Sequence, residues 1–113
     1  MKNRRSSEYR ERTLQARWLE ASEQFPVLFL TGPRQVGKTT VLQHLCTAER
    51  RYVTLDDLAV RTLARQDPEL FLQRFPPPVL IDEVQYAPQL LSSIKLRVDQ
   101  QRQLGAVWLT GSQ

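Results

Sequence analysis

The chain has 113 residues, of which 41% are hydrophobic and 25% charged, a composition typical of one soluble globular domain. This composition excludes collagen-like, low-complexity and wholly disordered chains. The longest apolar runs, at 26–30 and 76–81, are too short to cross a bilayer, and no apolar stretch follows the charged N-terminus as in a secretory signal. With a single cysteine no internal disulfide can form, so we expect a cytoplasmic protein that does not engage a membrane.

The formal net charge of +4 is concentrated in the first 17 residues, which hold six Lys and Arg side chains against two Glu. We expect residues 1–7 to form a disordered basic tail and residues 8–24 an amphipathic helix. A nucleic-acid-binding arm is one interpretation of this charge. A solvated tail followed by a charged helix face is the interpretation that we favour.

Short apolar runs alternate with amphipathic segments along the rest of the chain. The runs at 25–30, 51–55, 79–81 and 106–110 predict buried strands. The intervening segments predict helices over 38–47, 58–65, 68–75 and 88–103, with Asp67 as an N-cap and Pro68 in the first turn. Strands that alternate with helices predict an α/β fold with a parallel sheet, whose ligands bind at the carboxyl ends of the strands.

A phosphate-loop pattern, G-x-x-x-x-G-K-[ST], lies between the first predicted strand and the helix that follows it. Its glycines allow close approach of the backbone to phosphate, the Lys38 ammonium reaches the β- and γ-phosphates, and the Thr39 hydroxyl ligates Mg²⁺. Arg34 either contacts phosphate or faces solvent. Thr40 carries a further hydroxyl, which we expect to bond to solvent or backbone and not to act in catalysis. The expected nucleotide-binding residues are Gly32, Pro33, Arg34, Gln35, Val36, Gly37, Lys38, Thr39 and Thr40.

The third predicted strand delivers two carboxylates at its end, Asp82 and Glu83, as in a Walker-B pattern. We expect Asp82 to hold Mg²⁺ and Glu83 to orient and polarise the attacking water. Thr110 or Ser112, after the fourth strand, is expected to sense the γ-phosphate, and Thr110 is counted with Lys38 and Glu83 as catalytic.

Other polar and aromatic residues receive simpler interpretations. Asp56 and Asp57 either approach the metal site or cap the next helix, and we favour the cap. His44 is expected at the surface, and Cys46 as a small buried side chain. The two tryptophans, Trp18 and Trp108, are expected in the core. Neither N-K-x-D nor D-x-x-G, the GTPase signatures, is present in the sequence, which favours ATP over GTP.

Six segments together resemble the prokaryotic AAA-domain ATP-binding proteins, in which a P-loop ATPase domain precedes a C-terminal domain of unknown function. The resemblance covers 17–113 and rests on L-T-G-P-R-Q-V-G-K-T-T (30–40), Y-V-T-L-D-D (52–57), D-P-E-L-F (67–71), L-I-D-E-V-Q (80–85), I-K with V-D (94–99) and L-T-G-S-Q (109–113). It implies a P-loop NTPase three-layer sandwich with strand order 1-4-3-2. It also implies the nucleotide, Mg²⁺ and water roles given above for Lys38, Thr39, Asp82 and Glu83.

Proteins of this family are usually several times longer. The resemblance therefore implies that residues 8–113 are the N-terminal part of an AAA-type ATPase domain, and we expect the fifth strand, the C-terminal domain and the usual arginine finger to be missing. A neighbouring subunit or the missing domain would supply that arginine, and Arg97 and Arg102 are candidates for acting on a neighbour. Slow ATP hydrolysis is the leading functional hypothesis. The alternative is a nucleotide-dependent binding or regulatory module, or an inactive fragment, without useful turnover.

Overall fold

Helices and strands alternate along the chain, as the apolar runs predict. The computed structural model describes residues 4–32 and 37–112, with side chains from residue 8 onward. The elements are α1 (Arg4–Ser22), β1 (Val27–Thr31), α2 (Lys38–Gln43), β2 (Arg51–Thr54), α3 (Leu58–Gln66), α4 (Pro68–Arg74), β3 (Val79–Asp82), the 3₁₀ turn η2 (Val84–Tyr86), α5 (Gln89–Gln100) and β4 (Val107–Gly111).

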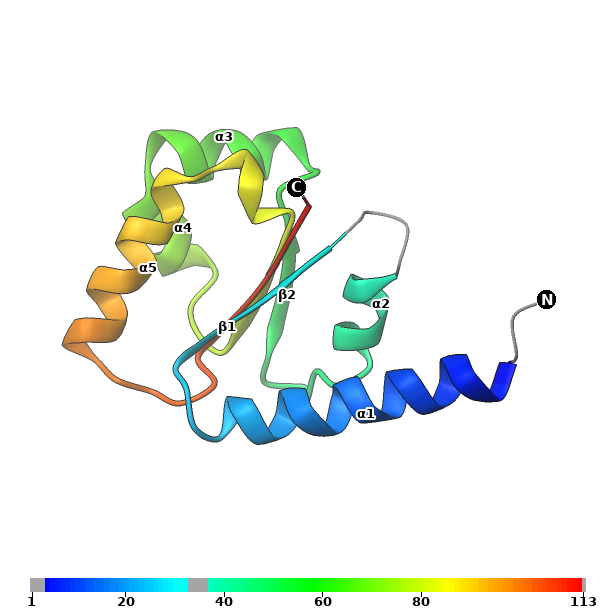
Figure 1. The fold of residues 1–113 in the computed structure, drawn as a ribbon. Coiled ribbons are helices and arrows are strands. Elements are labelled where there is room, and N and C mark those ends of the chain that lie inside the picture. Colours follow the sequence, from blue (N-terminus) through cyan, green and yellow to red (C-terminus); the bar gives the residue numbers. More distant parts are fainter. Residues whose placement is uncertain (1–3, 33–36, 113) are drawn as a thin grey trace.

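All four strands of the described chain are parallel and form one sheet in the order β1-β4-β3-β2, which confirms the expected order. Strands β1 and β2 are the two edges of this sheet (Figure 1). Across β2 and β3, Tyr52 lies opposite Leu80 and Thr54 lies opposite Asp82. Because the strands are parallel, their carboxyl ends share one edge of the sheet.

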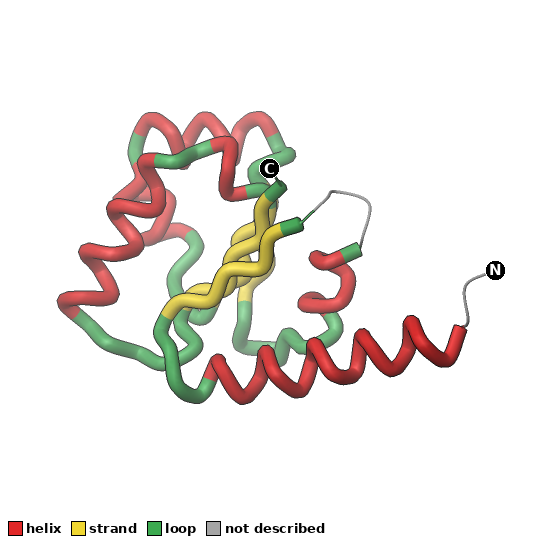
Figure 2. The backbone as a smooth tube through the Cα atoms, viewed as in Figure 1, coloured by secondary structure: helices red, strands yellow, loops and turns green. Residues whose placement is uncertain are grey.

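Helices cover both faces of the sheet, which gives the three layers of a P-loop NTPase-like fold (Figure 2). Helices α1 and α2 lie on one face, over a small core that includes Trp18, Leu80 and Trp108. The two indole rings meet edge to face at 5.7 Å, a favourable geometry for aromatic pairs. Helices α3, α4 and α5 lie on the other face, over a larger core that contains Phe71 and Ile81.

Helix boundaries differ from the sequence-based prediction most clearly in α1, α2 and α5. Helix α1 begins at Arg4, so residues 4–7, which were assigned to a tail, are helical. This part of the sequence has no Gly or Pro to stop a helix. Helix α2 ends at Gln43 instead of residue 47, and its β-branched run 39–41 has low helix propensity. Helix α5 is shorter at both ends than the predicted 88–103.

Two aspartates cap helices, as predicted. The Asp57 carboxylate accepts hydrogen bonds from the backbone N–H groups of residues 59 and 60 at the start of α3. Asp67 accepts from the N–H of Leu70 at the start of α4, with Pro68 in the first turn. These bonds satisfy backbone donors that have no partner within the helix.

Arg50 lies at the amino ends of β3 and β4 and forms hydrogen bonds to both segments. Its guanidinium lies 3.7 Å from the centre of the Trp108 ring and donates to the carbonyl oxygens of Val79, Gly105 and Ala106. Burial lowers the pKa of Arg50 from its usual value, with a smaller opposing effect from Cys46.

No helix in the described part of the chain is long and apolar enough to span a membrane.

Candidate functional site

Polar side chains from β3, β4 and α2 gather at the carboxyl edge of the sheet. Asp82 ends β3, Glu83 follows it, and Thr110 lies near the end of β4. Lys38, the lysine of the phosphate-loop pattern, begins α2. The sheet topology therefore brings Lys38 to the same edge as residues that lie 44 to 72 positions further along the chain.

The Asp82 carboxylate is the centre of this arrangement. Its Oδ1 accepts hydrogen bonds from the hydroxyls of Thr39, at 2.7 Å, and Thr110, at 2.5 Å. Its Oδ2 accepts a third hydrogen bond, at 3.1 Å, from the hydroxyl of Tyr52. Asp82 is only 7% exposed, so these donors replace most of the water that would solvate its charge.

Thr110 is fully buried and uses its hydroxyl twice. The hydroxyl donates to Asp82 and accepts from the backbone N–H of Glu83 at 3.3 Å. Thr110 therefore fixes the two acidic residues relative to each other. Ser112, the other candidate for sensing phosphate, accepts a hydrogen bond from the Lys38 ammonium at 3.3 Å.

Glu83 has an unusual backbone conformation for a residue with a side chain. Its φ of 60° and ψ of 46° are left-handed, which costs about 1–3 kcal/mol for a residue other than glycine. The conformation ends β3 and turns the chain into η2. It also directs the Glu83 side chain toward Gln85, whose amide donates to the Glu83 carboxylate at 2.6 Å.

Gln85 links the acidic pair to the end of β4. While its amide N–H₂ donates to Glu83, its amide oxygen accepts from the backbone N–H of Ser112 at 3.2 Å. A Cβ atom on Gly111 would lie 3.2 Å from that oxygen and 3.1 Å from the Phe29 ring. Glycine at position 111 therefore allows the close approach of these two side chains.

Tyr52 reaches the site from the edge strand β2. Burial and the nearby charge of Asp82 raise the pKa of its phenol to about 12. The phenol is therefore a neutral hydrogen-bond donor at physiological pH. Neither Tyr52 nor Gln85 was singled out from the sequence, although both lie in segments that carry the family resemblance.

Not every expected residue lies in the described site. Pro33, Arg34, Gln35 and Val36 are outside the described residues. Gly37 is at the N-cap of α2 with a φ of 65°, a conformation suited to glycine, while Thr40 is exposed on α2. The structure also places Trp18 and Trp108 in the core, His44 at the surface and Cys46 in a half-buried position.

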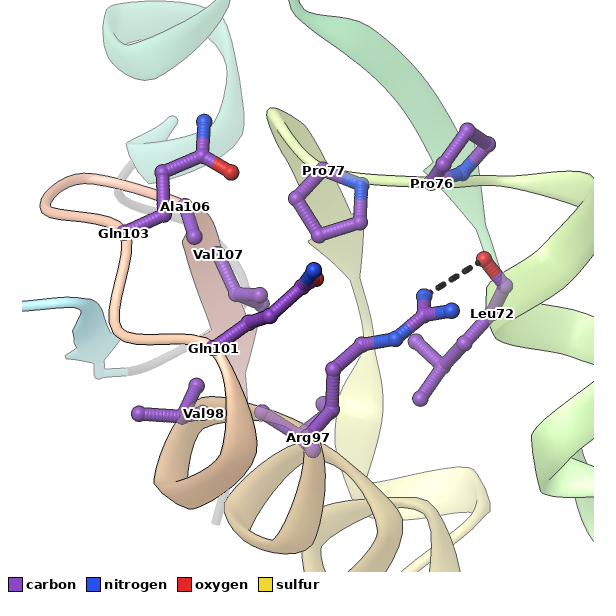
Figure 3. Close-up of a pocket in the computed structure, with 10 residues that line it drawn as sticks. Leu72, Pro76, Pro77, Arg97, Val98, Gln101, Gln103, Ala106 and Val107 are labelled. Atoms are coloured by element: carbon purple, nitrogen blue, oxygen red, sulfur yellow. Dashed lines mark hydrogen bonds between the residues drawn. The ribbon is translucent and has the colours of Figure 1, made fainter.

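The two candidate arginines lie elsewhere. Arg97 points into a cavity of about 180 Å³ at the amino ends of β3 and β4, the edge opposite the acidic pair (Figure 3). Its guanidinium donates to the carbonyl oxygen of Leu72 at 3.0 Å. Arg102 is exposed in the loop before β4.

The fold and the site together define a P-loop NTPase-like domain. The chain belongs to the AAA domain family, whose family model matches residues 24–113. Two uncharacterized proteins, from Mycobacterium bovis and Mycobacterium tuberculosis, are each 38% identical to it over 85 residues. The match covers 74% of this chain but 19% of each relative, so the chain spans about a fifth of their length. No solved structure matches the chain significantly.

Proposed function

We propose that this domain binds ATP together with Mg²⁺ and hydrolyses the ATP slowly. One observation carries the proposal: Thr39, from the phosphate-loop pattern, is hydrogen-bonded at 2.7 Å to Asp82 at the end of β3. A hydroxyl and a carboxylate are the oxygen donors that Mg²⁺ prefers. The residues present therefore fit a magnesium ion, with Thr39 and Asp82 as the residues that would hold it.

Lys38 and Glu83 have the further roles in this proposal. Lys38 would pair with oxygens of the β- and γ-phosphates, and Glu83 would orient a water molecule. The water oxygen attacks the γ-phosphorus, the bond to the β–γ bridging oxygen breaks, and ADP leaves with the electron pair. The proton lost by the water passes to Glu83 and then to solvent. Mg²⁺, when bound, would neutralise charge that develops on the phosphate oxygens.

The contact between Gln85 and Glu83 supports the alternative, a nucleotide-dependent module without useful turnover. The Gln85 amide donates to one oxygen of the Glu83 carboxylate at 2.6 Å, and this bond holds the side chain toward Gln85. An arginine supplied by another subunit or domain would raise the rate by about 10³ to 10⁵.

Phosphate release from ATP distinguishes the two candidates. We expect Glu83→Gln to lower turnover at least about 100-fold, because a general base contributes about 10² to 10⁴ to the rate. Glu49→Gln, the same change at an exposed position, is the matched control. ATP binding without turnover over a range of protein concentrations would favour the binding module. Turnover that persists in the Glu83 variant would contradict the hydrolytic role of this residue.

A further inference from the structure

The three hydroxyl groups that donate to Asp82 have different expected roles. Thr39 is itself an expected metal ligand, whereas Thr110 and Tyr52 are not. These two come from β4 and β2, the strands on either side of β3, and each contacts a different oxygen of the carboxylate. Together these two hydroxyls hold the Asp82 carboxylate from both neighbouring strands.

The strand register explains why the donor from β2 is a tyrosine. Thr54 lies directly opposite Asp82, but its hydroxyl accepts a hydrogen bond from the backbone N–H of Asp56 at 3.1 Å and is also hydrogen-bonded to the Tyr52 phenol. Tyr52 lies opposite Leu80, two residues before Asp82 on the same face of the sheet. Two residues of a strand rise about 6.6 Å, a distance that a phenol side chain can span and a shorter hydroxyl side chain cannot.

We propose that Tyr52 is a positioning residue, which orients the Asp82 carboxylate for Mg²⁺ and so couples metal binding to nucleotide binding. This role rests on the function proposed above. The residue Tyr52 is 41% exposed at the sheet edge, so its hydroxyl is not required to fill the core. The Tyr52 hydroxyl contributes to the site through its hydrogen bond to Asp82.

The coupling is measured by titrating ATP into the protein calorimetrically, once with excess Mg²⁺ and once with EDTA. The ratio of the two dissociation constants reports how strongly the metal assists ATP binding, and it requires no hydrolysis. We expect Tyr52→Phe to reduce this ratio about tenfold, the lower end of the effect of removing a group that supports a metal ligand. The dissociation constant in EDTA should stay within about twofold, because the phosphate loop is unchanged.

Tyr9→Phe makes the same chemical change at an exposed position of α1 and should leave both dissociation constants unchanged. Tyr52→Leu is a second variant without the hydroxyl, for use if Tyr52→Phe does not fold, and it should reduce the ratio by a similar factor. An unchanged ratio in the variants, or an equal loss of affinity with and without Mg²⁺, would overturn the role of Tyr52. A wild-type ratio of one is a different result, since it contradicts the proposed magnesium site itself.

Discussion

Replacing Thr110 by valine removes one hydroxyl from the centre of the site and keeps the size of the side chain. In the wild-type protein this hydroxyl donates to Asp82 and accepts from the N–H of Glu83. The substitution therefore removes two hydrogen bonds at a position with no exposed surface. We expect Thr110→Val to destabilise the fold and not only the site.

The magnitude follows from the two lost bonds. A hydrogen bond to a charged group contributes about 1.5–3 kcal/mol, and a buried N–H left without a partner costs about 1–3 kcal/mol. Asp82 keeps its donors from Thr39 and Tyr52, so the loss should lie near the lower end of the combined range. We expect the free energy of unfolding to fall by about 3 kcal/mol, a large part of the 5–15 kcal/mol typical of a domain.

Urea denaturation followed by circular dichroism measures this change. For a domain of this size, a loss of about 3 kcal/mol lowers the denaturation midpoint by about 1.5 M. Thr110→Ser is the matched control, because it keeps the hydroxyl and loses one buried methyl group, at a cost of about 1 kcal/mol. A valine variant as stable as the wild type, or more stable than the serine variant, would refute the reasoning.

Three further predictions concern positions away from Lys38 and Glu83. Asp57→Ala should lower the free energy of unfolding by about 1 kcal/mol in urea denaturation, because α3 loses its N-cap; no loss would show that the cap is not needed. Arg50→Lys should lower the free energy of unfolding by about 1–2 kcal/mol in the same assay, because a lysine cannot reproduce the planar guanidinium that donates to three carbonyl oxygens. Equal stability of this variant and the wild type would contradict this. The stabilisation that Tyr52 contributes should be fully present below its ordinary pKa of 10.0 and be lost as the pH rises through about 12, since the folded state raises this pKa. Thermal melts between these pH values should therefore show a smaller loss for Tyr52→Phe than for the wild type, and parallel losses would refute the assignment.

The sequence was most informative about strands and helix caps, which depend on apolar runs and on local hydrogen bonds. Apolar runs predicted each strand, and the family resemblance predicted the order of the strands. Short-range hydrogen bonding made the caps at Asp57 and Asp67 predictable. The ends of α1 and α2 were predicted less well, because helix termini depend on small differences in propensity and on tertiary packing.

The contacts of the site depend on register and backbone conformation, which the sequence does not specify. Tyr52 reaches Asp82 because β2 pairs with β3 in one particular register. Gln85 meets Glu83 because Glu83 adopts a left-handed conformation, which a glutamate rarely does. The fully buried position of Thr110 likewise follows from the packing around β4 and not from its neighbours in the chain.

The most direct test of the account is calorimetric titration of Mg²⁺-ATP into the folded chain, with Lys38→Ala and Lys95→Ala compared. Lys38 lies in the site, whereas Lys95 is exposed on α5. We expect micromolar binding that Lys38→Ala abolishes and Lys95→Ala leaves unchanged. A folded wild-type chain that binds no ATP, or binding that survives the loss of Lys38, would contradict it.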